Sequence, residues 1–437
     1  MSARGKEFIA GLEHCAEGIL DACTRCGRCV DVCPTIQPGG VDASDPPRLV
    51  QGILDLLAEK SGTAEAGRWA TLCNGSGQCI PACAYGVNPR LMLSLARLAS
   101  QRQSTPADGL AERGRRAFQK MGHGVQVLSR LQLPPALRDR LRDPPEKDAD
   151  VVFYTGCNIL KTPHIALLCL DVLDALEVRY RVDGGPARCC GVLQFRAGDA
   201  AMSGEVGLRT IEHLSGSDTA EVLAWCPSCQ VQLGEITLPT LARASNGSPF
   251  ELTPFVFYLK RNLDRLAKLF VNPVHARVGL HEHSGVEGIG DTVRDILEAI
   301  PGLEFVDLEQ PSVATMCATM GALPQYKRDL HEALLRAAEA AGVTMLAGVY
   351  HACHRELCSH ERDWPFEVVN FMELVGSSMG IERPDLFKRL KLMQDVDAIL
   401  ADSVELIDEY EMRIDDVREV VINELLGEQT LPLKGVQ

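Results

Sequence analysis

The chain has 437 residues, and its 46% apolar and 24% charged content is typical of a globular protein with two or three domains. Its formal net charge of -15 and its low aromatic content of 5% argue against a nucleic acid or an anionic membrane surface as a partner. No apolar run is long enough to span a membrane and no export signal is visible, so a cytoplasmic location is expected. In that compartment the seventeen cysteines are expected to bind metal rather than to form disulfides.

Residues 1–100 are predicted to form an α-helical domain that carries two cysteine motifs. Apolar residues from Phe8 to Leu20 recur at helical spacing before the first motif. A further helix is predicted to begin at Pro89, after the second motif, because proline is favoured in the first turn of a helix.

The first motif reads Cys23-Thr-Arg-Cys26-Gly-Arg-Cys29-Val-Asp-Val-Cys33-Pro34. This C-x2-C-x2-C-x3-C-P spacing is the signature of two-cluster ferredoxins, in which three cysteines bind one cluster and the fourth binds its neighbour. We therefore predict a [4Fe-4S] cluster on Cys23, Cys26, Cys29 and Cys83. Buried structural thiols that share this spacing by chance are the alternative interpretation.

The second motif departs from the first at one position. It reads Cys73-Asn-Gly-Ser76-Gly-Gln-Cys79-Ile-Pro-Ala-Cys83, so a serine stands where a second cysteine belongs. Cys33, Cys73 and Cys79 remain for a second cluster, and three thiolates suit a [3Fe-4S] cluster. The spacing resembles the three-iron motif of the succinate dehydrogenase and fumarate reductase iron–sulfur subunits. The alternative is a [4Fe-4S] cluster with the Ser76 oxygen, water or a distant group as its fourth ligand.

Residues 101–150 form a locally basic connector, with arginines such as Arg113, Arg115 and Arg116 outnumbering the acids. Two interpretations are open for it. It is either a docking surface for an acidic partner or a solvated strap across the cluster domain, and the strap is the simpler expectation.

From Val151 onward, predicted strands alternate with helices, which indicates parallel α/β sheets. The expected strands are 151–154, 177–182, 221–225, 277–281, 303–307 and 345–350, and the expected helices include 164–176 and 200–215. The second set of strands repeats the first. The predicted fold class is therefore α plus α/β, with tandem α/β domains at 151–272 and 273–400 and a helical C-terminal tail at 401–437.

Five cysteines follow the predicted strands of the first α/β domain. Cys157 follows one strand, Cys189-Cys190-Gly191 follows the next, and Cys226-Pro-Ser-Cys229 follows the third. Because the carboxyl ends of parallel strands share one edge, the five sulfurs can converge there. Gly191 would let the backbone pass close to a cluster.

This arrangement resembles the CCG domain of heterodisulfide reductase and of related iron–sulfur subunits in glycolate and lactate oxidising systems, over almost the whole chain. In heterodisulfide reductase an intact motif holds a noncubane [4Fe-4S] cluster. The resemblance therefore implies a noncubane cluster, with a redox role, on Cys157, Cys189, Cys190, Cys226 and Cys229. A zinc site or a cubane on four of them is the alternative, and five structural thiols are a further one.

The second α/β domain retains only two of those thiols. Ser284 stands at the first ligand position, Cys317-Ala318-Thr319 at the Cys-Cys-Gly position, and Tyr350 with Cys353 at the final pair. The simpler expectation is a degenerate repeat without a cluster. A zinc or iron site could still form from thiolates and imidazoles, drawn from His281, His283, Cys317, Cys353 and His354.

The cysteine motifs thus predict an electron-carrying oxidoreductase subunit, and the resemblance implies that it relays electrons between a flavoprotein partner and a terminal acceptor. A quinone-linked membrane partner would have to be a separate protein, and would hold the chain peripherally at the inner membrane. The alternatives are a disulfide or persulfide reductase acting at the five-cysteine cluster, and a scaffold subunit with structural zinc. No convincing nucleotide-binding fingerprint is present, since the glycine-rich turn from Gly285 to Gly290 does not match the dinucleotide spacing.

Overall fold

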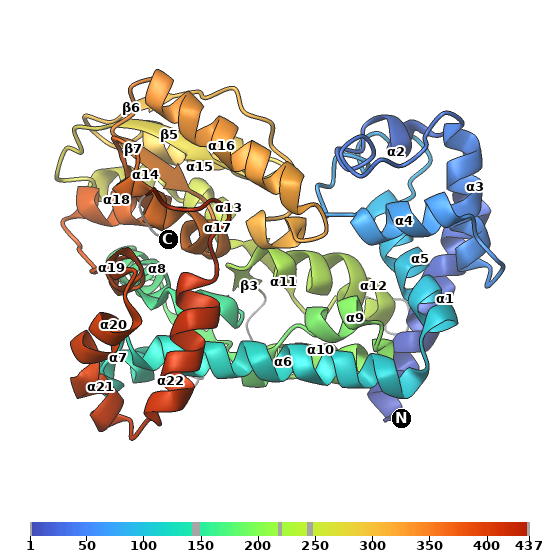
Figure 1. Ribbon diagram of the computed structural model, residues 1–437, viewed down its shortest axis with the longest axis horizontal. Helices are drawn as coiled ribbons and strands as arrows, with labels where there is room; N and C mark the ends of the chain where they lie inside the picture. Colours follow the sequence, from blue (N-terminus) through green and yellow to red (C-terminus); the bar gives the residue numbers. More distant parts are fainter. Residues whose placement is uncertain (1, 142–148, 217–220, 243–247, 435–437) are drawn as a thin grey trace.

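The computed structural model describes residues 2–141, 149–216, 221–242 and 248–434 (Figure 1). A helical N-terminal region lies at one end of the molecule, and two domains with small parallel sheets make up most of the rest. The predicted combination of α and α/β structure is confirmed. Among the described residues, no helix is both long and apolar enough to cross a membrane.

The N-terminal region is built from short helices around the cysteine loops. They are α1 (Ala3–Ala22), α2 (Arg28–Asp31), α3 (Pro46–Leu57), α4 (Ala64–Leu72) and α5 (Pro89–Ser104). The side chains of Ser2, Asp45, Thr63 and Asn88 each accept a backbone N–H at the start of a helix, as N-caps do. Both predicted helices are confirmed, and Pro89 is the first residue of α5.

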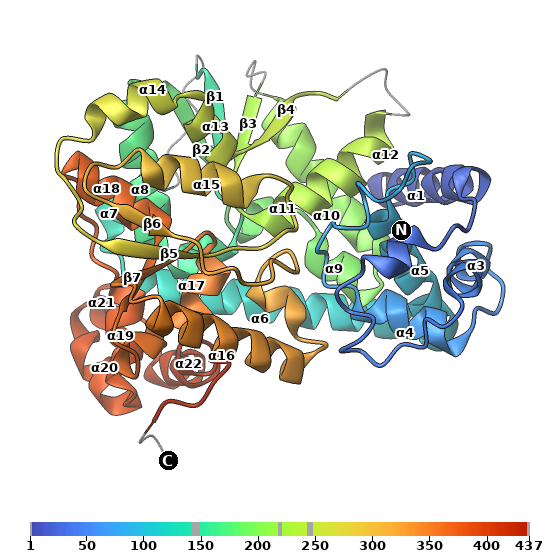
Figure 2. The ribbon, with the colours of Figure 1, turned by 90° about the horizontal axis from the view of Figure 1, so that it is seen from above.

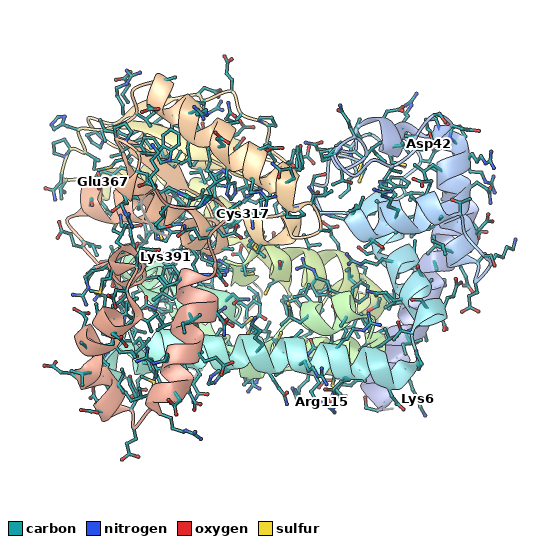
Figure 3. The ribbon with its side chains drawn as sticks, viewed as in Figure 1. Lys6, Asp42, Arg115, Cys317, Glu367 and Lys391 are labelled. Carbon is teal, nitrogen blue, oxygen red and sulfur yellow. The ribbon has the colours of Figure 1, made fainter. Side chains whose placement is uncertain are left out.

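The basic connector is largely one long helix with a buried face. It contains α6 (Ala107–Arg130) and α7 (Pro135–Arg140). The expected solvated strap is wrong for α6, because Leu110, Met121, Val125 and Leu128 recur at helical spacing and are buried. Arg115 lies on the exposed side of α6 (Figure 3). Residues 142–148 of the predicted connector lie outside the described residues.

The first sheet contains four parallel strands in the order β2-β1-β3-β4. Its domain comprises β1 (Val151–Tyr154), η1 (Asn158–Lys161), α8 (Pro163–Ala175), β2 (Tyr180–Asp183), η2 (Pro186–Arg188), α9 (Val192–Ala197), α10 (Ala200–Ser215), β3 (Glu221–Ala224), α11 (Pro227–Val231), η3 (Gln232–Thr237), α12 (Leu238–Ala242), β4 (Glu251–Pro254), α13 (Phe255–Arg261), α14 (Leu263–Leu266) and η4 (Ala267–Leu269). Phe153 belongs to a core with α8 and α13, and Val152 to a core with α10. Helices therefore cover both faces of this sheet.

Two details of this sheet differ from the prediction. β2 begins at Tyr180 rather than at residue 177, because Glu177 adopts a left-handed conformation (φ 52°) in the turn that follows α8. The edge strand β4 was not predicted. Its sequence Glu251-Leu-Thr-Pro254 is partly exposed and lacks the apolar run of a central strand.

The second sheet has the corresponding parallel order, β6-β5-β7-β8. Its domain comprises β5 (Arg277–His281), α15 (Ile289–Glu298), β6 (Glu304–Val306), η5 (Cys317–Met320), α16 (Pro324–Ala340), β7 (Met345–Gly348), α17 (His351–Leu357), η6 (Cys358–Arg362), β8 (Glu367–Asn370) and α18 (Phe371–Met379). The three expected strands are confirmed, and β8 was not predicted. α13 packs on α15 and α8 on α18, so one continuous apolar core joins the two domains.

The C-terminal residues pack into the protein rather than forming a free tail. They form α19 (Leu386–Met393), α20 (Val396–Asp402), α21 (Val404–Glu409), α22 (Ile414–Val420) and η7 (Val421–Leu426). Val420 and Leu425 are buried in one core with Leu128 of α6 and with the second sheet domain. The buried Lys161, four residues after Cys157, forms an ion pair with Glu424 at 2.6 Å.

The N-terminal region docks on the first sheet domain through α1, which lies against α10 and α12 (Figure 2). The helices approach closely where residues are small. A Cβ atom on Gly204 would lie 2.4 Å from the Cβ of Phe8, so this position requires glycine. The cysteine loops of residues 1–100 are thereby held on the same body as the five cysteines of the first sheet domain.

Candidate iron–sulfur sites

The thiols of Cys23, Cys26, Cys29 and Cys83 line one small cleft between the first cysteine loop and the segment that precedes α5. Burial raises the pKa of Cys29 to about 12, and its neighbours Cys23, Cys26 and Cys83 add to that rise. Cys26 is exposed, so this group lies close to the surface.

The two cysteine loops share one backbone conformation. Arg25 and Gly27 have left-handed φ angles of 62° and 82°, and Gly75 and Gly77, at the matching positions of the second loop, have 78° and 76°. Ser76 therefore occupies the backbone position that corresponds to Cys26. Its side chain is buried, and its N–H donates to Asn74 Oδ1 at 3.2 Å.

A second group of thiols is formed by Cys33, Cys73 and Cys79. Burial raises the pKa of Cys79 to about 12, and the nearby Cys73 and Cys33 contribute to the rise. Trp69, which is fully buried on α4, donates its indole N–H to Cys33 Sγ at 3.3 Å. Sequence reasoning missed Trp69, because nothing in the spacing of α4 links it to a cysteine 36 residues away. An N–H donor to a ligand sulfur stabilises the thiolate, and hence a reduced cluster.

The five cysteines of the first sheet domain converge at the carboxyl ends of β1, β2 and β3. The thiols of Cys157 and Cys190 act on the pKa of Cys189, and those of Cys190 and Cys226 act on the pKa of Cys229, so the five thiols lie in one group of close neighbours. All five are at most 7% exposed. Gly191 adopts a left-handed φ of 86°, and a Cβ there would lie 2.6 Å from the Ser203 carbonyl oxygen. Glycine thus allows the Cys-Cys pair to turn into the site.

The donor set of each group fits iron–sulfur chemistry. These five thiols cannot all ionise without a cation, because a thiolate raises the pKa of the thiols around it. The neighbouring Cys157 and Cys190 lower the pKa of Cys189, whereas Cys189 and burial raise the pKa of Cys157. Iron would neutralise several thiolates at once.

A cavity of about 250 Å³ separates the second thiol group from the five cysteines. Cys73 lies in one wall, and Val192 and Ser228, which adjoin the five-cysteine loops, lie in another. Its lining is cationic, with Arg90, Arg97 and Arg196. Burial lowers the pKa of Arg196, and the thiols of Cys190, Cys226 and Cys73 act in the opposite direction, so this guanidinium lies within electrostatic reach of both groups.

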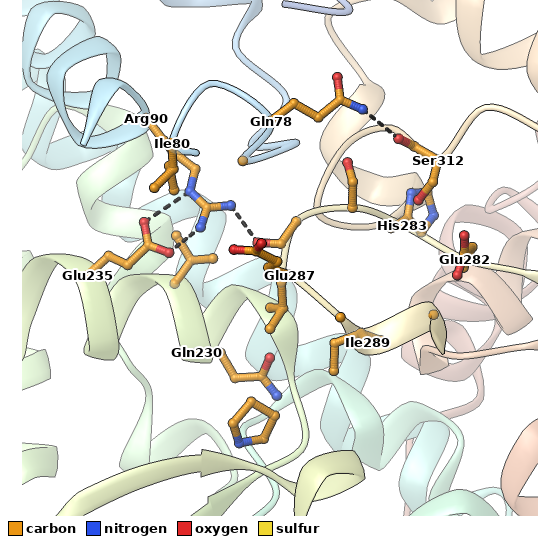
Figure 4. A pocket seen from close by; sticks show the side chains of 18 of the residues that line it. Gln78, Ile80, Arg90, Gln230, Glu235, Glu282, His283, Glu287, Ile289 and Ser312 are labelled. Carbon is orange, nitrogen blue, oxygen red and sulfur yellow. Dashed lines mark hydrogen bonds and ion pairs between the residues drawn. The ribbon is translucent and has the colours of Figure 1, made fainter. Parts of the chain in front are cut away.

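Arg90 contacts the N-terminal region, the first sheet domain and the second sheet domain. Its Nη1 donates to the carbonyls of Gly75 (2.7 Å) and Gly285 (2.6 Å), and its guanidinium forms an ion pair with Glu235 of η3 (Figure 4). It borders a larger cavity of about 530 Å³. The glycine-rich turn from Gly285 to Gly290 also lines this cavity, together with the acidic residues Glu235, Glu282, Glu287 and Asp291. These acids would repel the phosphates of a dinucleotide.

The second sheet domain brings His281, His283, Cys317 and Cys353 together, with their ligand atoms within 4.8 Å of one another. The prediction that His354 could join this site is wrong. His354 is fully buried, but its Nε2 lies 2.6 Å from Asp385 Oδ2, in a separate group with His164 and Glu373. Adjacent residues of a helix point about 100° apart, so Cys353 and His354 on α17 cannot face one site.

The remaining cysteines lie outside these groups. Cys15, Cys169 and Cys358 are buried, and Cys169 lies among the apolar side chains of α8, as a core residue does. Burial raises the pKa of Cys358 to about 12. Three of the seventeen cysteines therefore lie outside the four groups described above, which contain the other fourteen.

Comparison with known proteins defines the class to which these sites belong. The family description "4Fe-4S dicluster domain" matches residues 19–87, which contain both N-terminal motifs. The description "Cysteine-rich domain" (CCG) matches residues 151–234, which contain all five cysteines of the first sheet domain. The chain thus combines a dicluster ferredoxin domain with a CCG domain, as its motifs predicted.

Similar proteins extend the match beyond these domains. A component of the dihydromethanophenazine:CoB–CoM heterodisulfide reductase of Methanosarcina mazei is 24% identical over 400 residues, covering 83% of this chain and 95% of that protein. A component of the fumarate reductase (CoM/CoB) of Methanothermobacter marburgensis is 23% identical over 344 residues, which are 76% of this chain and 65% of that protein. A probable glycolate oxidase iron–sulfur subunit of Bacillus subtilis is 35% identical over 89 residues, one fifth of each chain.

No solved structure matches the chain significantly. The relatives are subunits of oxidoreductases. The chain therefore contains a 4Fe-4S dicluster domain and a CCG domain, and over most of its length it is similar to a heterodisulfide reductase subunit.

Proposed function

We propose that the chain relays single electrons between a flavoprotein partner and a terminal acceptor through three clusters. The first is a [4Fe-4S] cluster on Cys23, Cys26, Cys29 and Cys83. The second is a [3Fe-4S] cluster on Cys33, Cys73 and Cys79. The third is a noncubane [4Fe-4S] cluster on Cys157, Cys189, Cys190, Cys226 and Cys229.

The observation that carries this proposal is the continuity of the three thiol groups. The Cys29 thiol of the first group contributes to the raised pKa of Cys79 in the second. The second group and the five-cysteine loops border the same cavity, and Arg196 is within electrostatic reach of both. Cys26 is exposed, so an electron from a partner would enter at the first cluster. It would then pass to the second cluster and from there to the third.

The charges around the path favour electron acceptance. Arg97 and Arg90 lower the pKa of Cys73 against the larger effect of burial, and the same positive charge stabilises a reduced, more negative cluster. Single-electron clusters suit a partner flavin, because a flavin can release its two electrons one at a time. A quinone-linked acceptor would require a further protein.

A second candidate function is reduction of a disulfide or persulfide at the five-cysteine cluster. The cationic cavity favours it, since Arg97 and Arg196 could hold an anionic sulfur compound beside Ser228, between Cys226 and Cys229. Reduction of a disulfide would consume two electrons and two protons and release two thiols. The three clusters would deliver the electrons one at a time.

The second sheet domain is proposed to be a degenerate CCG domain, with boundaries near residues 273–400. The equal strand order of the two sheets supports a common origin. Ser284 stands at the position that corresponds to Cys157, and the second domain retains two cysteines at the matching positions. A purely scaffolding role for the whole chain is disfavoured by the five thiols that converge in the first domain.

Rapid freeze-quench EPR of the anaerobic protein tests the relay. After mixing with a reductant, the N-terminal clusters should be reduced first and the five-cysteine cluster later. Cys73→Ala, which removes a ligand of the second cluster, should slow reduction of the five-cysteine cluster at least about tenfold. Cys15→Ala, which lies outside the thiol groups, should leave the rate unchanged. An unchanged rate in Cys73→Ala would contradict the proposed order.

Mixing the reduced protein with disulfides of different charge separates the two functions. A reductase would be reoxidised by an anionic disulfide, and Arg196→Gln would slow that reaction. A carrier would be reoxidised only by a redox partner. The disulfide-reductase function would be ruled out if neither anionic nor neutral disulfides oxidised the protein.

A further inference from the structure

The second sheet domain carries a four-residue group of thiols and imidazoles where the first carries its five cysteines. His281 ends β5, His283 lies two residues beyond it, Cys317 begins η5, and Cys353 lies in the first turn of α17. Cys317 lies near the centre of the molecule in Figure 3. We propose that these four side chains bind one Zn²⁺ ion in a closed tetrahedral site.

The distances fit such a site. His281 Nε2 lies 3.1 Å and His283 Nε2 lies 3.4 Å from Cys317 Sγ. In a tetrahedral zinc site with bond lengths of about 2.0 and 2.3 Å, nitrogen and sulfur ligands lie about 3.5 Å apart. His281 Nε2 would move away from Cys317 Sγ by a few tenths of an ångström to admit the ion, and all four ligand atoms already lie within 4.8 Å of one another.

Hydrogen bonds from neighbouring residues orient His283 and would stabilise the Cys317 thiolate for metal binding. The Nδ1–H of His283 donates to the Val313 carbonyl at 2.5 Å, which leaves the Nε2 lone pair directed at the site. His331 is buried, and its Nε2 lies 3.3 Å from Cys317 Sγ, where an N–H would stabilise a thiolate. Zinc-binding histidines commonly have such outer hydrogen bonds, and so do thiolate ligands.

The donor set and the compactness of the site together select one zinc ion over an iron–sulfur cluster. Two thiolates are too few for a four-iron cluster, while two thiolates and two imidazoles are a common structural zinc set. A Rieske [2Fe-2S] centre also uses two cysteines and two histidines, but its two pairs bind different irons, whereas these four ligand atoms all lie within 4.8 Å of one another, as ligands of one ion do. Cys317 and Cys353 are fully buried, His283 is 4% exposed and His281 is partly buried. Four protein ligands fill a tetrahedral coordination sphere, as in structural zinc sites. Binding would displace the proton of each thiol that is not already ionised.

The site also lies beside the contact between the two domains. Cys353 is two residues from His351, whose Nδ1 accepts the indole N–H of Trp225 at 3.2 Å. Trp225 immediately precedes the cluster ligand position Cys226. A zinc ion on Cys353 would therefore fix the start of α17, and with it the side chain that supports one loop of the five-cysteine site. Zinc binding itself does not depend on the proposed electron relay.

Metal analysis of the full-length protein tests the proposal. Anaerobically purified protein should contain about one zinc per chain in addition to its iron. Cys353→Ser should lose that zinc, while Cys358→Ser, a buried cysteine of the same domain outside the site, should keep it. Iron content should be unchanged in both variants, which separates this test from the proposed relay.

A cobalt-loaded protein identifies the ligands directly. Replacement of zinc by Co²⁺ should give the visible absorption of a tetrahedral site with thiolate-to-cobalt charge transfer, and Cys317→Ser should reduce the charge-transfer band by about half. His331→Gln, which alters only the outer contact, should retain the tetrahedral spectrum. This variant also provides a test when a cysteine substitution prevents folding.

Three results would overturn the proposal. One is a folded protein with normal iron and no zinc that gives no tetrahedral cobalt spectrum. Another is equal zinc content in Cys353→Ser and Cys358→Ser. The third is iron, rather than zinc, lost on substitution of Cys317 or Cys353.

Discussion

The two sheet domains share a strand order but differ in the chemistry at the carboxyl edge of the sheet. The first places five thiols there, from the loops after β1, β2 and β3. The second places two thiols and two imidazoles at the corresponding edge, after β5 and β7 and at η5. The sheet fixes where ligands can meet, and the loop residues decide which metal they can hold.

The two N-terminal cysteine loops also share a backbone conformation but differ in one ligand residue. Their left-handed positions match, from Arg25 and Gly27 in one loop to Gly75 and Gly77 in the other. The backbone is therefore suited to a cluster in both loops, and the ligand set differs only where Ser76 replaces a cysteine. The comparison predicts that cluster type follows the side chains and is insensitive to the shared backbone.

The largest expected effect is the loss of a whole cluster from the first sheet domain. Cys189→Ala should remove about four of about eleven irons, because Cys189 connects the two halves of the five-thiol group. The matched substitution in the second domain, Cys317→Ala, should remove none. Iron analysis and EPR of the two anaerobic variants check this contrast. Loss of all iron in Cys189→Ala would show instead that the clusters assemble only together.

A smaller change is expected at the second N-terminal cluster. Ser76→Cys restores the missing thiol on a backbone that already matches Cys26, so the cluster should gain one iron and become [4Fe-4S]. The EPR signal of an oxidised three-iron cluster should disappear. If the unaltered protein already shows a four-iron cluster at this site, the assignment of three irons is wrong.

The cationic cavity should set the reduction potential of the second cluster. Arg97→Gln removes a positive charge that acts on Cys73, which should lower the potential by about 40 mV, corresponding to about 1 kcal/mol for one electron. Arg102→Gln lies on the same helix but is exposed, and should shift the potential far less. Redox titration followed by EPR measures both variants. Equal shifts would remove the basis for an electrostatic role of Arg97.

The smallest effect concerns the contact between the two sheet domains. Burial and Lys388 lower the pKa of His164 on α8, but Asp385 and Glu373 of the second domain outweigh them, so its pKa lies above the usual value of about 6.5. His354 also packs against its ring. Since the folded-state pKa is raised, this contact should stabilise the protein fully below about pH 6.5 and be lost as pH rises through the folded-state pKa.

His164→Gln should therefore lower the free energy of unfolding by about 1 kcal/mol at pH 6, and by less at pH 8.5. Anaerobic denaturant titrations of both proteins at several pH values measure the difference. His14→Gln, an exposed histidine beside Glu17, serves as the control and should change little. A difference that grows with pH would contradict the sign of the proposed contact.

Cysteine spacing allowed much of the candidate site to be predicted, because the ligands of each loop are local in sequence. Strand ends could be located from short apolar runs, so the convergence of Cys157, Cys189 and Cys226 could be expected. Contacts between residues that are far apart in the sequence could not be predicted in this way. Trp69 reaches Cys33, and Arg90 reaches Gly285, only after the helices have packed.

The errors have similar physical causes. Edge strand β4 lacks an apolar run because it is partly exposed, and His354 was assigned to the wrong site because helix geometry separates it from Cys353. The arginines of α6 favour a solvated strap, whereas the spacing of Leu110, Met121 and Val125 indicates the buried helical stripe that the structure contains. Charge on one face of a helix does not exclude burial of the other.

The five-thiol group of the first sheet domain is tested most directly by Mössbauer spectroscopy of the anaerobic, iron-enriched protein. The account predicts about four irons with a spectrum distinct from those of two ferredoxin-type clusters, which hold about seven more. A spectrum that contains only the ferredoxin-type irons, from folded protein in which all five thiols are found unoxidised after unfolding, would contradict it.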